Sequence, residues 1–350
     1  MAERTPVVSV VVPCYNYGRF LDACIGSVLS QRDVATRVLI IDDCSTDDSA
    51  DVGRRIAERN ENVEFRRHEV NRGHIATYNE GLLGWADGEY VTLLSADDLL
   101  TEGSLARSVE LMAKHPSVGM VYGRSEDFED DRHLPDPGRH RGSLVHSGPA
   151  WLARRFSQGV NVVPTPGTVL RTDVHRRVGG YDPTLPHAGD FELWLRVAAV
   201  ADIGFVRGVA QGLYRIHGAS MSHGVYQQAL ADIRQRRLVF SSVEAKCGPE
   251  LERAGITAAG TRASLAGEPL WRACRAYEKG VVAQAPIAEF LEFAEETYPD
   301  FRRLRAYRAL RRRQRLGESF CHRTQLFIGT AVVRKLQNLW WWFRWRRYGG

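Results

Sequence analysis

The fold is indicated by three stretches of common design: VVSVVVPCYN (residues 7–16), VLIIDDCSTDD (residues 38–48) and YVTLLSADD (residues 90–98). Each begins with a short apolar run, largely β-branched, which predicts a strand buried on both faces of a sheet. Each ends in polar or acidic residues. Apolar residues at helical spacing separate the runs, as over residues 20–29. This alternation predicts an α/β domain with parallel strands joined by right-handed crossovers.

The pattern continues beyond these stretches. Further strands are expected at residues 63–69, 118–122 and 168–170, and further helices at 45–56, 75–85, 105–112, 151–156 and 191–200. Residues 126–148 are polar and rich in His, Arg, Asp and Pro, which predicts a surface loop or lid. Helical patterns at residues 225–243 and 276–298 predict that the body of the chain ends in helices.

The composition limits the class of protein. The 350 residues are 44% hydrophobic and 25% charged, which is ordinary for a soluble globular chain. The sequence contains no run of 18 apolar residues, so it predicts no membrane-spanning helix, and its N-terminus has no secretory signal pattern. The six cysteines are scattered, and no two are spaced as in a zinc site or a disulfide framework. We therefore expect a cytoplasmic protein.

The net charge of +5 conceals a strong asymmetry. Residues 301–350 carry thirteen arginines and Lys335 against one acid, Glu318, and four tryptophans lie among the last arginines. Indole rings settle at headgroup depth and guanidinium groups meet anionic lipid, so this tail predicts peripheral attachment to the inner face of the cell membrane. The alternative is a solvated helix that packs some tryptophans on the body. Nucleic acid is not expected as a partner, since no recognised binding motif is present.

Two acidic pairs follow predicted strands. Ligands of parallel α/β sheets bind beyond the carboxyl ends of the strands, where these acids would gather. Asp97 and Asp98 offer hard oxygen ligands for Mg²⁺ or Mn²⁺, and such a metal would hold a diphosphate. Asp43 could accept a hydrogen bond from the N3–H of a pyrimidine base. For both pairs the alternative is a helix cap, and for Tyr15, which could stack on a base, it is simple packing.

Two later stretches add chemistry. Asp190 stands at a predicted helix start, where it could deprotonate a substrate hydroxyl or merely cap the helix. His217 follows Arg215 and precedes a glycine, so it could complete a metal or diphosphate site, although a lone histidine is usually structural. The sequence has neither a Gly-x-Gly-x-x-Gly turn after its first strand nor a Walker loop, which disfavours dinucleotide dehydrogenases and P-loop enzymes.

In their order along residues 7–222, five stretches resemble family 2 glycosyltransferases of the GT-A fold: VSVVVPCYNYGRFLDACIGSVLSQ, IIDDCSTDDSA, NRGHIATYNEGLLGWADGEYVTLLSADD, GGYDPTLPHAGDFELWLRVA and YRIHGASMS. The resemblance implies a Rossmann-like mixed sheet flanked by helices, here followed by a C-terminal helical extension. It also implies an inverting transfer of a sugar from a nucleotide-diphospho-sugar to an acceptor hydroxyl. The expected domains are a glycosyltransferase domain (1–225), a helical extension (226–300) and the basic tail (301–350).

The resemblance assigns the donor-binding residues by position. Pro13, Tyr15 and Asp43 would frame the base, with Asn16 beside them. Arg72 would lie close to the base or the diphosphate. The implied donor is a UDP- or dTDP-sugar.

The resemblance also assigns the metal and catalytic residues. Asp97 would touch the ribose or the metal, and Asp98 would ligate the cation, Mn²⁺ or Mg²⁺. His217 would support metal and diphosphate, and Asp190 would be the catalytic base. Gly189 departs from the family pattern, because many members carry an acid there.

The expected function is therefore metal-dependent glycosyl transfer to a carbohydrate or lipid-linked acceptor in cell-envelope polysaccharide or glycolipid synthesis. His74 departs from the small residues frequent at its position in the family and bears on donor choice. One alternative is a catalytically inactive GT-A module that binds nucleotide or acts as a scaffold; the intact acidic positions disfavour it. Another is a nucleotidyltransferase, whose first loop is usually Gly-rich and basic, unlike residues 13–18.

Overall fold

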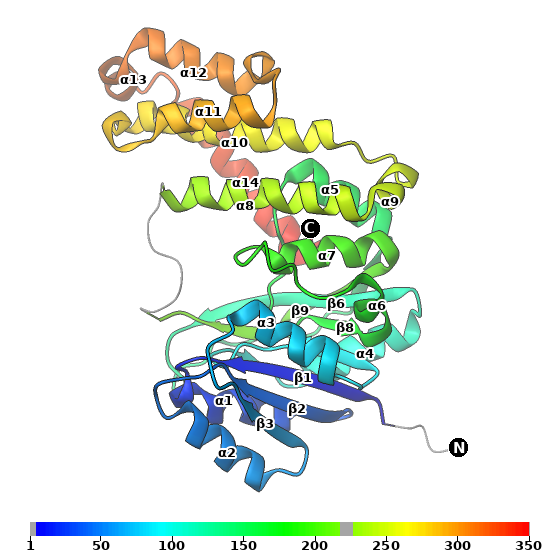
Figure 1. The fold of residues 1–350 in the computed structure, drawn as a ribbon. Coiled ribbons are helices and arrows are strands. Elements are labelled where there is room, and N and C mark those ends of the chain that lie inside the picture. The colour runs from blue at the N-terminus through cyan, green and yellow to red at the C-terminus, as the bar shows by residue number, and fades with distance from the viewer. Residues whose placement is uncertain (1–4, 218–226, 350) are drawn as a thin grey trace. The chain divides into compact units, whose positions relative to one another are not determined.

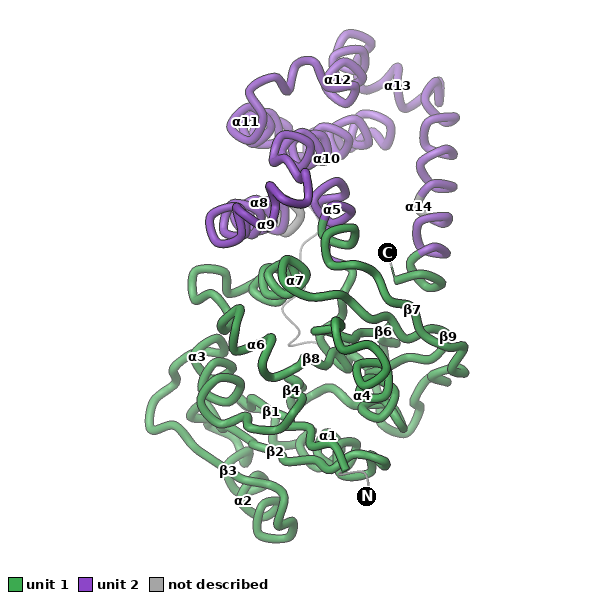
Figure 2. Tube along the Cα trace, turned by 90° about the vertical axis from the view of Figure 1, so that its right-hand side faces the viewer, with its two compact units in different colours: residues 1–152, 162–219, 345–350 green, residues 153–161, 220–344 purple. Residues whose placement is uncertain are grey.

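A computed structural model of the chain describes residues 5–217 and 227–349 (Figure 1). Two compact units, coloured separately in Figure 2, make up the chain. The first unit comprises residues 1–152, 162–219 and 345–350, and the second comprises residues 153–161 and 220–344. The expected boundary at residue 225 falls outside the described residues, so the division into 1–225, 226–300 and 301–350 stays a prediction.

The first unit is built on one mixed sheet with the strand order β3-β2-β1-β4-β8-β6-β9-β5, and β7 pairs with β9. The strands are β1 (Val7–Cys14), β2 (Ala35–Asp42), β3 (Val63–Arg67), β4 (Tyr90–Leu93), β5 (Leu99–Leu100), β6 (Val118–Phe128), β7 (Ser143–His146), β8 (Val169–Arg171) and β9 (Asp202–Arg215). β3, β2, β1 and β4 are parallel, whereas β8 runs antiparallel to β4 and β6. The expected mixed sheet is confirmed.

Helices flank this sheet (Figure 1). They are α1 (Gly18–Leu29), α2 (Ser49–Arg59), α3 (His74–Asn79), the π-helix η1 (Glu80–Trp85), α4 (Ser104–Lys114), α5 (Gly148–Gln158), α6 (Thr172–Val178) and α7 (Gly189–Val200). The core lies where the apolar runs of β1 and β2 are covered on both faces, and their valines, leucine and isoleucines have no exposed surface over residues 10–12 and 38–41. Burial on both faces is the reason that these runs are continuously apolar.

The second unit is helical. Its elements are α8 (Gln227–Lys246), α9 (Gly248–Arg253), α10 (Ala258–Lys279), η2 (Val282–Gln284), α11 (Ile287–Thr297), η3 (Phe301–Arg303), α12 (Arg305–Leu316), α13 (Glu318–Thr324) and most of α14 (Ile328–Tyr348). The residues of α14 from Trp345 onward belong to the first unit. α10 is central and packs against α8, α11, α12 and α13. Leu270, Ala273 and Phe290 are fully buried there. This unit confirms the expected C-terminal helical region.

Three local expectations are corrected. The helix expected over 276–298 ends at Lys279, because Gly280 adopts a left-handed conformation (φ 71°), and a new helix starts only at Ile287. The loop expected over 126–148 contains the end of β6 and the whole of β7. The helix expected over 75–85 changes to π-helical winding at Glu80. The helix expected at 225–243 is described from Gln227 onward, and its first two residues lie outside the described part.

The basic tail adopts two long helices, α12 and α14. Arg313 of α12 is buried and pairs with Glu278 at 2.6 Å. Trp345, in the first unit, donates its indole N–H to the carbonyl of Val162 at 2.9 Å, so this tryptophan packs on protein. Trp340 is 60% exposed. In the part of the chain that the structure describes, no helix has the length and apolar content needed to cross a bilayer.

Candidate active site

The carboxyl ends of β1 and β2 lie at one edge of the sheet, because the two strands are parallel. The loops that follow them are tied together through Asn16, which takes the left-handed conformation that asparagine tolerates (φ 59°). Its backbone N–H donates to the Ser45 hydroxyl at 2.8 Å, and its side-chain carbonyl accepts from Thr46 N–H at 2.8 Å. Asn16 thus holds the loops in place. Pro13 is part of β1, opposite β2, and Tyr15 is 47% exposed at the sheet edge.

Asp43 organises the next loop. Its Oδ1 accepts hydrogen bonds from Arg72 N–H at 2.8 Å and from His68 Nδ1 at 2.7 Å, and its Oδ2 accepts from Gly73 N–H at 2.9 Å. Burial alone would raise the pKa of Asp43, but these hydrogen bonds lower it below the ordinary value. A carboxylate accepts about four hydrogen bonds, so one position is left for a ligand.

A second carboxylate completes this corner. Glu80 Oε2 lies 3.0 Å from His68 Nε2 and 2.6 Å from Arg72 Nη1. The imidazole of His68 therefore lies between two carboxylates, those of Asp43 and Glu80, and both ring nitrogens donate when each carries a proton. Arg72 is held by its backbone to Asp43 and by its guanidinium to Glu80, with half of its side chain exposed.

Asp97 and Asp98 lie beyond the end of β4, beside the end of β9. Backbone N–H of Arg215 donates to Asp98 Oδ1 at 3.0 Å, and the Arg215 Nε donates to the Asp97 carbonyl at 2.8 Å. His217 Nε2 lies 3.1 Å from Asp97 Oδ2. Burial, together with the negative charge of Asp97, raises the pKa of Asp98 well above its usual range. The structure thus brings Asp97, Asp98 and His217 together, as expected from the sequence. The Gly218–Ser222 part of the last matching stretch lies outside the described residues.

The donor set at this edge fits a divalent cation. Mg²⁺ and similar ions are usually held by one or two carboxylates and completed by substrate phosphates, so a protein cage is not required. The adjacent carboxylates of Asp97 and Asp98 are ligands of the type that such an ion takes. A cation would also oppose the repulsion that disfavours ionised Asp98. Among residues 5–217 and 227–349, no group of three or more His, Cys, Asp or Glu side chains is arranged to hold a metal alone.

Asp190 occupies the first turn of α7, where the helix dipole favours a negative charge. The negative charges of Asp190, Asp97 and Asp98 all act on the hydroxyl of Tyr78, and burial followed by these charges raises the pKa of Tyr78 above its ordinary value. The Tyr78 ring lies 5.3 Å from that of Tyr181 in an edge-on contact.

The segment before α7 is anchored to α3. His74 Nε2 donates to the carbonyl of Pro186 at 2.8 Å. Asn79 donates to the Tyr181 carbonyl at 2.9 Å and accepts from its N–H at 2.7 Å. These bonds fix the loop that leads to Asp190.

The sequence does not predict several residues that the structure places in the candidate site. They are His68, Glu80, Tyr17, Tyr78 and Tyr181, and the sequence marks Arg215 only as a neighbour of His217. Tyr78 carries a faint signal, since it stands one helical turn after His74 on α3. Tyr17 precedes α1, and burial followed by the charge of Asp97 raises the pKa of Tyr17 to about 12. For the others the only signal would be their proximity in space to the strand ends.

Comparison with solved structures supports the fold. TarS of S. aureus, residues 1–349, superposes with a TM-score of 0.56 at 18% identity, covering 89% of this chain and 91% of TarS. A mannosyltransferase from Pyrobaculum calidifontis, solved with GDP-Man and Mn²⁺, gives a TM-score of 0.52 at 19% identity, covering 84% of this chain and 87% of the other. These are GT-A glycosyltransferases, so the expected fold class is confirmed.

Comparison of sequences identifies the family. An uncharacterized glycosyltransferase of Nostoc sp. is 28% identical over 218 residues, 61% of this chain and 66% of the relative. The putative teichuronic acid biosynthesis glycosyltransferase TuaG of Bacillus subtilis is 32% identical over 134 residues, 38% of this chain and 53% of TuaG. The matched stretch thus spans less than two thirds of either relative. Residues 9–176 match the model of glycosyl transferase family 2, so this part of the chain is a family 2 glycosyltransferase domain.

Proposed function

We propose that the protein transfers a sugar from a nucleotide-diphospho-sugar to an acceptor hydroxyl, with inversion at the anomeric carbon. One observation carries the proposal: Asp97, Asp98 and His217 lie together at the carboxyl edge of the sheet, where His217 Nε2 is 3.1 Å from Asp97 Oδ2 and Arg215 N–H donates to Asp98 Oδ1 at 3.0 Å. In a single displacement the acceptor oxygen and the leaving diphosphate stand on opposite sides of one carbon. A base on one side and diphosphate-binding groups on the other, within one small region, is the arrangement that this reaction needs.

The donor base is assigned to the corner formed by Asp43. The remaining acceptor position of its carboxylate suits the N3–H of uracil or thymine, while exposed Tyr15 offers a ring to stack on the base. Arg72, already oriented by Glu80, would face the base or the diphosphate. A UDP- or dTDP-sugar fits this corner. TarS has been solved with UDP-GlcNAc, a donor of the first type.

Asp97, Asp98 and His217 are the residues that would hold Mn²⁺ or Mg²⁺ and the diphosphate. The cation, when bound, would neutralise the charge that develops on the departing diphosphate. Asp98 is buried and Arg215 N–H fixes one of its oxygens, so its carboxylate is preorganised.

Asp190 is the proposed base. The acceptor oxygen forms a bond to the anomeric carbon as the bond from that carbon to the phosphate oxygen breaks. The electron pair leaves with the nucleoside diphosphate, and the acceptor proton passes to the Asp190 carboxylate. The rings of Tyr78 and Tyr181 pack edge-on, and His74 holds the loop before Asp190 through the carbonyl of Pro186. Gly189 leaves two acids in this turn, Asp190 and Glu192, and Glu192 is buried and pairs with Arg196 at 2.8 Å.

The test is nucleotide release from UDP-, dTDP- and GDP-sugars, with and without Mn²⁺, followed by NMR of the product anomer when an acceptor is found. Asp98→Asn should remove metal-dependent release, and Asp190→Asn should lower transfer by at least about a hundredfold, the contribution of a general base. Asp33→Asn is the matched control, because Asp33 is exposed and its left-handed backbone (φ 62°) suits asparagine. Metal-dependent nucleotide binding without any turnover would favour an inactive nucleotide-binding module.

The proposed product is a cell-envelope polysaccharide or glycolipid. The names of the relatives support this: TuaG is named for teichuronic acid biosynthesis, and two Pasteurella multocida relatives, each 24% identical over 199 residues, are a hyaluronan synthase and a chondroitin synthase. We expect a carbohydrate or lipid-linked acceptor in this pathway.

We also propose that α14 attaches the enzyme to the inner face of an anionic membrane. Val332, Leu336, Leu339, Trp340 and Phe343 follow helical spacing, and each is at least half exposed. Lys335, Arg344 and Arg347 stand between and after them. An exposed apolar stripe with tryptophan among basic residues is typical of helices that lie in the bilayer interface.

A further inference from the structure

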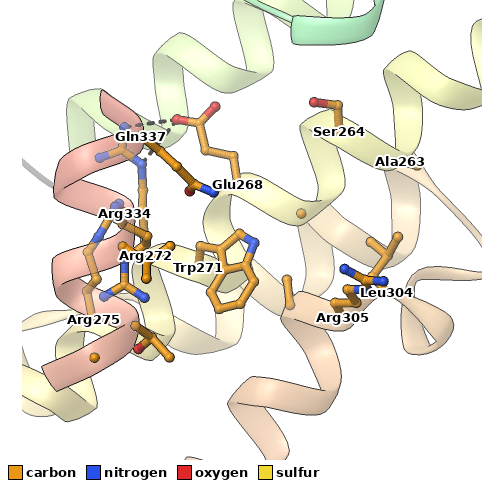
Figure 3. Close-up of a pocket in the computed structure, with 15 residues that line it drawn as sticks. Ala263, Ser264, Glu268, Trp271, Arg272, Arg275, Leu304, Arg305, Arg334 and Gln337 are labelled. Atoms are coloured by element: carbon orange, nitrogen blue, oxygen red, sulfur yellow. Dashed lines mark hydrogen bonds and ion pairs between the residues drawn. The ribbon is translucent and has the colours of Figure 1, made fainter. Parts of the chain in front are cut away.

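The second unit contains an open groove of about 920 Å³, lined by parts of α10, α12 and α14 (Figure 3). Such a volume is large enough for a drug-sized ligand or a few sugar rings. The side chains that give it chemical character are Glu268, Trp271, Arg272, Arg275, Arg305 and Arg334. None of them belongs to the sheet-edge site described above.

The groove carries excess positive charge. Its four arginines face one acid, Glu268, and that acid is already engaged, since it pairs with Arg236 at 2.8 Å and with Arg272 at 3.0 Å. Arg305 is exposed and makes neither a hydrogen bond nor an ion pair with any residue that the structure describes. An anion entering the groove would therefore meet a guanidinium group that is free to bind it.

Arg334 provides a second, independent indication of a ligand. Its Nη2 donates to Glu278 at 2.6 Å, but its Nη1 is buried and has no hydrogen-bond partner among the described residues. A buried guanidinium donor without a partner is costly, and in native structures it usually meets an ion, a water or a ligand. An oxygen anion bound in the groove would satisfy it.

Trp271 gives the groove an apolar face. Figure 3 shows its indole in the middle of the groove, with Arg272 on one side and Arg305 on the other. The Arg334 guanidinium lies 6.0 Å from the centre of the ring. The C–H face of a pyranose packs on such a ring, while Arg305 and Arg334 would take the charges that the sugar carries.

A second basic groove, of about 490 Å³, follows along α12. Five arginines line it together with Tyr307 and Leu316: Arg302, Arg308, Arg311, Arg312 and Arg315. Two concave basic sites along one helix suit a chain with repeated negative charges better than a single phosphate. A bilayer surface is flat and does not enter a groove, and stacked bases would call for more than one aromatic platform.

We propose that the groove around Trp271 binds an anionic saccharide chain, one that carries carboxylate or phosphate groups. We further identify this saccharide as the acceptor, and that identification rests on the proposed function. The binding of the saccharide does not rest on it. The α12 groove would extend the contact by charge alone.

The test is direct binding to the full chain, measured by calorimetry. The probes are hyaluronan octasaccharide, a poly(glycerol phosphate) fragment and, as neutral control, a maltooligosaccharide of equal length. At least one of the two anionic probes should bind, and the neutral probe should bind at least about tenfold more weakly than that probe. Trp271→Ala and Arg305→Gln should each weaken anionic binding by about tenfold or more. Arg253→Gln, an exposed arginine of α9 outside both grooves, should change it less than twofold.

The outcomes separate this inference from the proposed function. Saccharide binding without nucleotide release would support the groove as a saccharide site and refute the proposed transferase activity. Nucleotide release without saccharide binding would support the transferase activity and refute the saccharide site. Equal losses in Arg253→Gln and Arg305→Gln would mean unspecific charge attraction and overturn the inference, as would equally tight binding of single-stranded DNA of the same charge. Arg305 is exposed, so its variant keeps the test valid if Trp271→Ala fails to fold.

Discussion

Replacement of Asp43 by asparagine tests the corner that is proposed to bind the base. The carboxylate of Asp43 accepts from Arg72 N–H, Gly73 N–H and His68, and its side chain is only 5% exposed. An amide keeps one acceptor oxygen, so at least one donor would face an NH₂ group and the others would lose a charged partner. Hydrogen bonds to charged groups contribute about 1.5–3 kcal/mol and neutral ones about 1 kcal/mol, so we expect a loss of about 3 kcal/mol in the free energy of unfolding.

The pH dependence of this loss has a defined sign. The pKa of Asp43 is lowered in the folded protein, by hydrogen bonds that outweigh the effect of burial. Its contribution to stability is therefore complete above the unfolded pKa of about 3.9 and is lost as the pH falls through the lower folded pKa. Asparagine does not titrate. The difference between wild type and Asp43→Asn should be constant at neutral pH and shrink below about pH 4.

The assay combines urea unfolding with amide hydrogen exchange and a UDP titration. Because the chain has two units, its global unfolding need not be two-state. Hydrogen exchange of the Arg72 and Gly73 backbone amides therefore measures the local stability of this corner more directly. Both amides should lose protection in Asp43→Asn, and UDP should bind about tenfold more weakly, as expected for a lost charged hydrogen bond. Asp33→Asn is again the control. Unchanged protection and unchanged UDP affinity in Asp43→Asn would refute the role assigned to this carboxylate.

Two further changes test packing and membrane attachment. A methyl group added at Gly81 would overlap a methyl carbon of buried Val11, so Gly81→Ala should destabilise the first unit by about 1–3 kcal/mol in thermal unfolding. Gly84→Ala, in the same π-helix with open space around it, should be neutral or stabilising, and equal effects of the two would contradict the packing argument. In flotation with phosphatidylglycerol vesicles, Leu336→Gln and Trp340→Gln should release the protein into the soluble fraction, and retention of both variants, or equal binding of wild type to neutral vesicles, would exclude α14 as the anchor.

The parallel half of the sheet and the acids at its edge were predictable from the sequence. β1, β2 and β4 each contain a largely apolar run that is buried on both faces, and the polar residues after the run mark the sheet edge. The edge strand β3, VEFRR, is mostly polar and is the exception. Asp43, Asp97 and Asp98 follow such runs directly. The structure brings Asp97, Asp98 and His217 to one place, and the roles of these residues stay predictions.

The long strand β9 was not predictable in the same way. Its sequence, DIGFVRGVAQGLYR, has three glycines that weaken any strand pattern. Yet close packing favours them: a side chain at Gly212 would overlap Pro166, and Gly208 has a left-handed backbone (φ 83°) with Arg141 against it. The pairing of β9 with β6 shows register shifts over the same region. The glycines therefore follow from tertiary contacts that a single sequence does not display.

The segment from His68 to Asn79 shows most clearly what the sequence leaves out. The sequence predicts a strand over 63–69 and a helix over 75–85, and the structure has β3 ending at Arg67 and α3 beginning at His74. However, the side chains of this segment contact both halves of the candidate site. His68 bonds Asp43 at the proposed base corner, whereas His74 and Asn79 hold the loop that leads to Asp190.

The contacts of His74 and Asn79 join residues more than 100 positions apart, and that of His68 joins residues 25 positions apart. No periodicity or spacing encodes them. They also have a consequence for the chemistry. A displacement reaction depends on the distance between the bound donor and the base, and a misplacement of about 1 Å costs about a hundredfold in rate. In the proposed mechanism, the short segment from His68 to Asn79 would set that distance, because one piece of backbone bonds both Asp43 and the loop that leads to Asp190. Changes there should therefore alter donor binding and transfer together, unlike changes at Asp43 or Asp190, each of which lies at one end.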